Sequence, residues 1–299
     1  MAPEITTFPN EKPEHPYTLG TRGGQVTGNF WSMFCGGCGY GIVFQLFNRV
    51  MLDASLNPMN YPVVLGIGCY TQGDTLVPAV QQRLTTLHGR APAVATGIKL
   101  ANPLLKPIIF TGDGDCYGIG GNHFIHTCRR NLDCILLVLN NSIYGMTGGQ
   151  VAPTTPVGYK SMTTFERVFE SRMDGIKIAI AAGATYVARI TVAHPRTFMR
   201  YLKKAIAHKG TSVIEVVSPC VTYFGRKNVN EEGERMDSGA LLMDWIKTHS
   251  IWTNQAKLLG DAELQDKYVI GEFKEDESVP EYAEEYEKIK QQASRGGPE

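Results

Sequence analysis

The hydrophobic positions of this chain form short apolar runs that alternate with segments of helical spacing. Apolar runs next to glycine or proline are typical of buried parallel strands, whereas apolar positions repeating every three or four residues indicate helices. The two kinds of segment follow one another between residues 40 and 217. Expected helices are 40–54, 90–101, 119–131, 174–182 and 195–208, and expected strands are 62–68, 107–111, 134–139, 184–190 and 212–217.

This alternation predicts an α/β fold with a doubly wound parallel sheet, whose ligand site lies at the carboxyl ends of the strands. Residues 1–30 are rich in Pro and Gly and lack periodicity, so we expect an N-terminal arm. Residues 226–299 contain an amphipathic stretch at 241–246 and an acidic stretch at 272–290, which we interpret as a C-terminal helical arm. This arm is expected either to pack on a partner subunit or to be a solvated helix.

Charge and composition exclude several classes of protein. The chain has 29 basic and 29 acidic residues and no basic run, so neither nucleic acid nor a membrane surface is an expected partner. No apolar stretch reaches the roughly 18 residues of a membrane helix, and the N-terminus lacks the basic and apolar segments of a signal peptide. We therefore expect a cytoplasmic protein, in which structural disulfides are rare.

Polar residues follow two consecutive expected strands. Gly-Asp-Gly-Asp at 112–115 follows one strand, and Asn140-Asn141 follows the next. Glycine lets the backbone approach a ligand, a carboxylate suits a hard cation, and a helix start attracts phosphate. Asn141 lies 28 residues after Asp113, and the helix and strand between them return the chain to the same edge of the sheet. We expect Asp113, Asn141 and one backbone carbonyl to share a Mg²⁺ that binds a diphosphate.

Other nucleotide sites are less consistent with the sequence. Gly-Asp-Gly by itself is a common turn, so its interpretation depends on the strand before it and the Asn pair after it. No G-x-G-x-x-G opens a helix after the first strand, and no G-x-x-x-x-G-K-S/T occurs. A Rossmann dinucleotide site and a P-loop are therefore not favoured.

Four of the seven cysteines lie in loops that can share one rim of the sheet. Cys35 and Cys38 form a C-x-x-C motif in a Gly-rich loop before the first helix. Cys69 and Cys220 each follow an expected strand. Four thiolates suit either zinc or an iron–sulfur cluster. The remaining cysteines sit in apolar segments and receive no role, because free cysteine is usually a small core residue: Cys116, Cys128 and Cys134.

Taken together, these motifs resemble the β subunits of 2-oxoacid:ferredoxin oxidoreductases, especially those that use 2-oxoglutarate. The resemblance spans most of residues 30–225, and its joint occurrence of motifs is highly specific. The matching stretches are CGGCGYG (35–41), GIGCYTQ (66–72), LHGRAPAVATGIKLANP (87–103), GDGDCYGIGGNHFIHTCRRN (112–131), LNNSIYGMTGGQVAPTTP (139–156) and SPCVTYF (218–224). The resemblance implies that residues 31–225 form a pyrophosphate-type domain that binds thiamine diphosphate (TPP) and a cluster.

The resemblance also implies which residues hold the cofactors. Asp113, Asn141 and the Ile143 carbonyl would bind Mg²⁺, and the four loop cysteines would hold one [4Fe–4S] cluster near TPP rather than zinc. His88 and Arg90 are further candidates near the diphosphate or the substrate carboxylate, or else packing residues. The residues expected around the cofactor are Gly68, Cys69, His88, Gly112, Asp113, Gly114, Asp115, Asn141, Ile143, Gly145, Met146 and Thr147.

The implied reaction is the oxidative, coenzyme A-dependent decarboxylation of a 2-oxoacid, with electrons passing through the cluster to ferredoxin. In the family it is reversible and can fix CO₂. The glutamate that activates TPP comes from the α subunit there, and we find no convincing equivalent in this chain. We therefore expect an α partner, in a dimer of α–β heterodimers.

Substrate choice rests on the loop at 144–150, which resembles that of 2-oxoglutarate enzymes. Relatives that use pyruvate or a broad range of 2-oxoacids often carry lysine where this chain has Gly148. Met146, Thr147 and Gly148 are expected in the substrate pocket, or else form a Gly-rich loop over the cofactor. A pyruvate or broad-range enzyme, a non-oxidative TPP-dependent decarboxylase and a cluster-binding redox scaffold remain alternatives.

Overall fold

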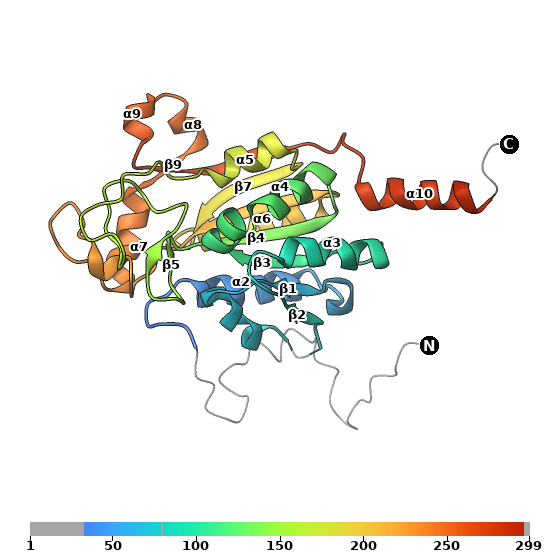
Figure 1. Ribbon diagram of the computed structural model, residues 1–299, viewed down its shortest axis with the longest axis horizontal. Helices are drawn as coiled ribbons and strands as arrows, with labels where there is room; N and C mark the ends of the chain where they lie inside the picture. Colours follow the sequence, from blue (N-terminus) through green and yellow to red (C-terminus); the bar gives the residue numbers. More distant parts are fainter. Residues whose placement is uncertain (1–32, 79, 296–299) are drawn as a thin grey trace, which may run out of the picture.

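A single eight-stranded sheet organises the protein in the computed structural model, which describes residues 33–78 and 80–295 (Figure 1). The strand order is β2-β1-β3-β4-β8-β7-β10-β9. The strands are β1 (Val63–Leu65), β2 (Arg83–Thr85), β3 (Ile108–Gly112), β4 (Cys134–Asn140), β7 (Tyr186–Thr191), β8 (Thr211–Val217), β9 (Ser250–Trp252) and β10 (Tyr268–Glu275). The six strands from β2 to β7 in this order pair in parallel, which confirms the predicted parallel sheet. The expected arm at 1–30 lies outside the described residues.

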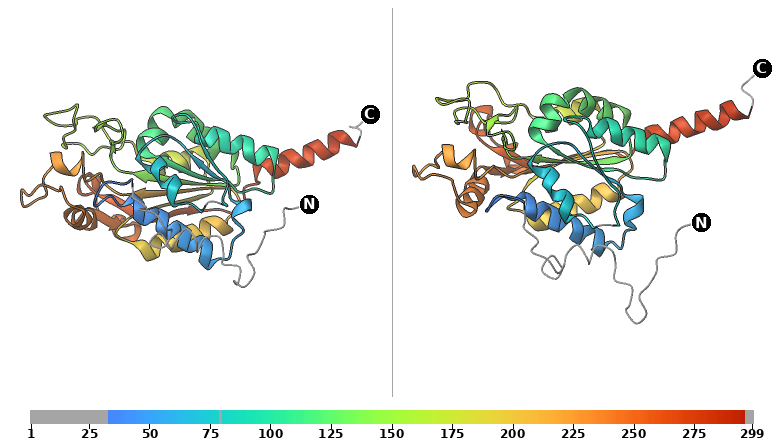
Figure 2. Two further views of the ribbon diagram at one scale, coloured as in Figure 1. Left: turned by 90° about the horizontal axis from the view of Figure 1, so that it is seen from below. Right: turned by 60° about the horizontal axis from the view of Figure 1, so that its bottom comes forward.

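Helices cover both faces of the sheet (Figure 2). On one face, α2 (Tyr40–Asp53) packs against α6 (Pro195–Ala207). On the other lie α3 (Ala91–Ala101), α4 (Gly121–Arg130) and α5 (Gly175–Ala182). Because side chains alternate across a strand, each central strand feeds two apolar cores, one beneath each helix layer. All seven residues of β4 are buried, as expected for a strand covered on both faces.

Several short elements were not predicted from the sequence. The chain leaves β3 through a π-helical turn, Gly114–Ile119, so α4 begins slightly later than expected. Strand β2 lies at the edge of the sheet with all three residues exposed, and it has no apolar pattern to reveal it. A separate antiparallel hairpin of β5 (Ile143–Tyr144) and β6 (Gln150–Val151) carries the Gly-rich loop.

The expectation of a purely helical segment at 226–299 is wrong. Helix α7 (Gly239–Thr248) accounts for the amphipathic stretch, but β9 and β10 continue the main sheet. Strand β10 pairs antiparallel with β7 and buries Tyr268 and Ile270 in the core. Short helices α8 (Thr253–Ala256) and α9 (Asp261–Leu264) connect these strands. In the described part of this segment, helix α10 (Tyr282–Ser294) projects from the body as an arm (Figures 1 and 2).

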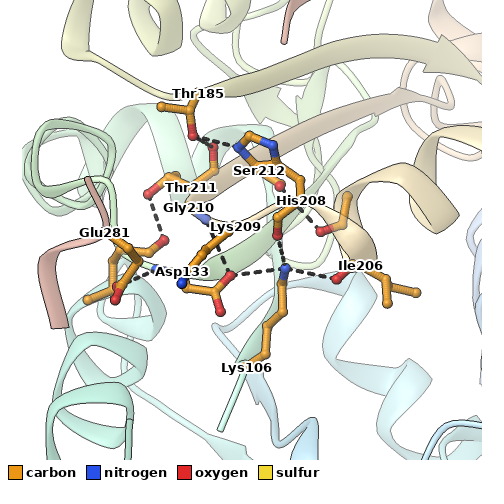
Figure 3. A network of polar contacts seen from close by, with 12 residues as sticks. Lys106, Asp133, Thr185, Ile206, His208, Lys209, Gly210, Thr211, Ser212 and Glu281 are labelled. Carbon is orange, nitrogen blue, oxygen red and sulfur yellow. Dashed lines mark hydrogen bonds and ion pairs between the residues drawn. The ribbon is translucent and has the colours of Figure 1, made fainter. Parts of the chain in front are cut away.

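A buried polar network holds the base of α10 at the amino ends of the central strands (Figure 3). The Asp133 backbone N–H donates to Glu281 Oε1 at 2.9 Å. Lys106 pairs with the Asp133 carboxylate at 3.0 Å and donates to the carbonyls of Ile206 and His208, where α6 ends. Among the described residues, every helix is too short or too polar to cross a lipid bilayer.

Candidate functional site

A cavity of about 420 Å³ opens at the carboxyl ends of β1, β3 and β4. All twelve residues expected around the cofactor line it, so the structure brings them together from loops that are distant in sequence. Arg90 and Gly148 do not line it. Arg90 lies on the surface beside His123, and Gly148 lies half-buried in the loop between β5 and β6.

Asp113 is a buried acid that lines the cavity where the diphosphate is expected. The Asn141 backbone N–H donates to its Oδ1 at 3.3 Å, and the Thr154 hydroxyl donates to its Oδ2. The Ile143 N–H donates to the side-chain oxygen of Asn141 at 3.3 Å, so these two expected magnesium ligands share one turn, and the Asn141 N–H links that turn to Asp113. Burial raises the pKa of Asp113 to about 7, since the charged carboxylate is poorly solvated there.

Asp115 also lines the cavity, and hydrogen bonds from neighbouring residues fix its carboxylate in place. Its Oδ2 accepts hydrogen bonds from Tyr70 at 2.7 Å and Thr111 at 3.0 Å. Its Oδ1 accepts from the Gly89 N–H at 2.7 Å and lies 3.5 Å from His88 Nδ1. This carboxylate therefore fixes the loop that presents His88 at the cavity, and both its oxygens already have partners.

The β5–β6 hairpin forms the outer wall and presents Met146, which is 45% exposed. The Thr147 hydroxyl donates to Gln150 Oε1 at 2.6 Å and closes the loop. Gly149 has a φ of +94°, and an added Cβ there would lie 2.8 Å from both Met162 and Tyr223. Only glycine fits this backbone and this space.

Sequence reasoning missed Thr154, which approaches Asp113 from the segment after the hairpin. It lies 41 residues from Asp113, beyond a loop of variable geometry, so no strand-end rule could have located it. Tyr144 was also missed as a wall residue; its hydroxyl donates to the Gly114 carbonyl at 3.1 Å. The Tyr144 ring also explains why residue 114 is glycine, because a Cβ there would lie 2.3 Å from a ring carbon.

The loops of the four candidate cysteines meet on one rim of this cavity. A Cβ placed on Gly145 would lie 3.1 Å from Cys69 Sγ and 3.9 Å from Cys220 Sγ, so both thiols face the same point. The Cys38 N–H donates to the Cys35 carbonyl at 3.0 Å, which closes the C-x-x-C turn. A Cβ on Gly37, within that turn, would lie 3.3 Å from a Val221 methyl carbon, next to Cys220.

Burial favours the protonated form of three thiols on this rim, because it raises the pKa of Cys38, Cys69 and Cys220. Burial and the neighbouring thiols raise the pKa of Cys38 to about 11 and that of Cys69 to about 12. All seven cysteines are free, as expected, and the three without an assigned role are buried. Within the described part of the chain, no three or more His, Cys, Asp or Glu side chains are already gathered around a metal position.

Comparison with known proteins identifies the family. The model of the "thiamine pyrophosphate enzyme, C-terminal TPP binding domain" matches residues 66–216. A Methanocaldococcus jannaschii protein named 2-oxoglutarate synthase subunit KorB is 48% identical, over 86% of this chain and 92% of that protein. A 2-oxoacid:ferredoxin oxidoreductase subunit beta from Sulfolobus sp is 34% identical, over 85% of each chain. The chain belongs to the 2-oxoacid:ferredoxin oxidoreductase β-subunit family.

A solved structure agrees with this membership. The 2-oxoglutarate:ferredoxin oxidoreductase from Magnetococcus marinus, with 2-oxoglutarate, coenzyme A and succinyl-CoA bound, aligns with a TM-score of 0.76 at 25% identity. The alignment covers 98% of this chain and 95% of that one. The resemblance drawn from the motifs and the predicted α/β fold of the TPP-binding type are thus confirmed, and this β subunit carries a TPP-binding domain.

Proposed function

We propose that this β subunit acts with an α subunit to convert 2-oxoglutarate and coenzyme A to succinyl-CoA and CO₂, with electrons delivered to ferredoxin. The same enzyme can run in reverse and fix CO₂, and it works in the cytoplasm. The observation that carries the proposal is that one cavity gathers the twelve expected cofactor residues beside a rim with suitable cysteines. The M. jannaschii relative, named for 2-oxoglutarate, supports this substrate over the pyruvate or broad-range alternative.

The diphosphate end of the cavity suits Mg²⁺. A carboxylate from Asp113, the amide oxygen of Asn141 and the Ile143 carbonyl are the hard oxygen ligands that this ion prefers. The pKa of Asp113 is raised by burial, and a bound cation would stabilise the charged form of this carboxylate. When bound there, TPP supplies the electron sink that lets CO₂ leave a 2-oxoacid. The protein's part is to orient the cofactor, hold the 2-oxoacid beneath the 145–149 loop and exclude water.

The rim suits a [4Fe–4S] cluster held by Cys35, Cys38, Cys69 and Cys220. The sulfurs of Cys69 and Cys220 both lie next to Gly145, and the C-x-x-C turn lies against the loop that carries Cys220. Burial raises the pKa of Cys38 and Cys69, and a bound metal centre would favour their thiolate forms. A cluster here would take up electrons one at a time, directly beside the cavity.

Among the described residues that line the cavity, none is a spare acid that could activate TPP, which supports an α partner. Asp113 and Asp115 are the acidic residues among the described residues that line it. Asp113 faces the magnesium position, and Asp115 is committed to Tyr70, Thr111 and the Gly89 N–H. We expect the α subunit to supply the carboxylate, in a dimer of α–β heterodimers.

The test uses the α–β complex, purified without oxygen. We expect a brown protein with about four irons per β chain, whose visible absorbance bleaches with 2-oxoglutarate and coenzyme A and recovers with oxidised ferredoxin. Equal bleaching by pyruvate would favour the broad-range alternative. A colourless complex that contains one zinc per chain would refute the cluster. If Cys35→Ser left 2-oxoacid turnover intact, the reaction would be a non-oxidative decarboxylation.

A further inference from the structure

An ion pair lies buried in the middle of the sheet, away from the residues assigned to cofactors. Glu215 on β8 and Arg189 on β7 are direct neighbours in the strand register and are 1% and 7% exposed. Arg189 Nη2 lies 3.2 Å from Glu215 Oε2 and 2.6 Å from Asp174 Oδ1. Replacing such a pair with apolar residues often costs nothing or even stabilises a protein, so stability alone does not account for it.

The other carboxylate oxygen of Glu215, Oε1, points toward the carboxyl end of β4, where the cavity opens. It accepts a hydrogen bond of 2.6 Å from the Asn140 side-chain amide. An ionised carboxylate only accepts, so the NH₂ group of Asn140 must face β8 and its carbonyl oxygen must face the turn after β4. Glu215 therefore fixes the orientation of the Asn140 side-chain amide.

The oriented Asn140 oxygen organises the turn that contains Asn141. It accepts from the Ser142 N–H at 3.0 Å and holds Ser142 at a φ of +61°, a left-handed conformation unfavourable for serine. That turn brings the Asn141 N–H to Asp113 Oδ1. The same Asn140 oxygen lies 3.2 Å from the Thr154 hydroxyl, which also contacts the other oxygen of Asp113.

We propose that Glu215, Asn140 and Thr154 are positioning residues for the magnesium–diphosphate end of the cavity. Glu215 orients Asn140, Asn140 shapes the turn that carries Asn141, and Thr154 sets the Asp113 carboxylate. Arg189 keeps a compensating charge beside Glu215. The inference rests on the proposed function, because it assigns these residues to the Mg²⁺ and TPP that Asp113 and Asn141 are proposed to hold.

The test measures binding rather than turnover, in the α–β complex stripped of TPP and Mg²⁺. Equilibrium dialysis gives the Kd of TPP at several Mg²⁺ concentrations. In Glu215→Gln one carboxylate oxygen becomes an NH₂ group. Arg189 and Tyr117 both donate to Oε2, so the remaining carbonyl oxygen is expected to face them and the new NH₂ group to face Asn140. Two donors then face each other unless the Asn140 amide turns over, so we expect the Kd to rise at least tenfold. The matched control is Tyr117→Phe, which removes the 3.2 Å hydrogen bond to the other Glu215 oxygen and should change the Kd less than twofold.

Thr154 offers an independent pair of variants outside the main sheet. Thr154→Val loses the hydroxyl at constant shape and should also weaken TPP at least tenfold, whereas Thr154→Ser keeps it and should restore most of the affinity. Unchanged affinity in Thr154→Val and Glu215→Gln would overturn the proposal, as would an equal loss in Tyr117→Phe. If Glu215→Gln does not assemble, the comparison of the Thr154 variants decides. A wild-type complex that binds no TPP would overturn the proposed function itself.

Discussion

Lys106→Met should destabilise the protein without affecting its cofactor site. Lys106 is 8% exposed, and its ammonium group donates to the carbonyls of Ile206 and His208 and pairs with Asp133 at 3.0 Å (Figure 3). It thus satisfies carbonyls at the end of α6 and balances the acid whose backbone holds the base of α10. Methionine fills the same space but donates nothing.

The expected loss of stability follows from the groups that lose the Lys106 ammonium as a partner. Asp133 keeps Lys99 at 3.3 Å, but two buried carbonyl groups lose their donor. Removing one partner of a buried pair costs about 3–5 kcal/mol, which in a chain of this size lowers the melting temperature by about 6–10 °C. Burial lowers the pKa of Lys106, so part of this interaction is already offset by desolvation, and the lower end of the range is expected.

The assay is thermal unfolding of the α–β complex, followed by circular dichroism, with the TPP Kd measured in parallel. Lys203→Met is the matched control, because Lys203 is half exposed and lies 3.9 Å from Asp53; its effect should stay within about 0.5 kcal/mol. An unchanged melting temperature in Lys106→Met would refute the reasoning about the network. A melting temperature that falls together with TPP affinity would show that the two ends of the sheet are not independent.

Three further outcomes are expected at the cofactor edge. The pKa of Asp113 is raised to about 7, so protons compete with Mg²⁺ for its carboxylate near neutral pH. The Mg²⁺ concentration that gives half-maximal TPP binding should therefore rise as the pH falls from 8 to 6. Asp113→Asn should abolish this pH dependence together with most TPP binding in dialysis. Gly149→Ala, at a φ of +94° and against two side chains, should raise the KM for the 2-oxoacid by more than tenfold while the TPP Kd stays within threefold. Cys69→Ser should lower iron content in an iron assay, whereas Cys128→Ser, a buried core position, should not.

The main architecture was predictable because the central strands are buried on both faces. Such strands appear in the sequence as unbroken apolar runs, and the helices between them keep a clear apolar stripe. Parallel strands also end at a common edge, so Asp113 and Asn141 could be placed together from their positions after two consecutive runs. These inferences needed only local pattern and one topological rule.

The elements that were not predicted lack either a clear local pattern or a position fixed by the rule that parallel strands end at a common edge. Strand β10 pairs antiparallel with β7, but three of its last four residues are charged and an acidic stretch follows, so its sequence suggests a solvated helix. The β5–β6 hairpin has only two residues in each strand, and its shape depends on Gly149 and the side chains packed against it. Thr154 reaches Asp113 only through that hairpin. Each position depends on tertiary packing that no local pattern encodes.

One sequence signal of the positioning network was nevertheless present. The strand at 212–217 contains a glutamate within an otherwise apolar run, and the strand at 184–190 contains an arginine in a similar setting. Burying either charge alone is costly, so two opposite charges in strands that are both expected to be buried must meet across the sheet. In the structure they do, and the remaining hydrogen-bonding capacity of Glu215 is directed at Asn140. A charge that breaks the pattern of a buried strand is thus best interpreted as part of a network, and here that network ends at the proposed magnesium ligands.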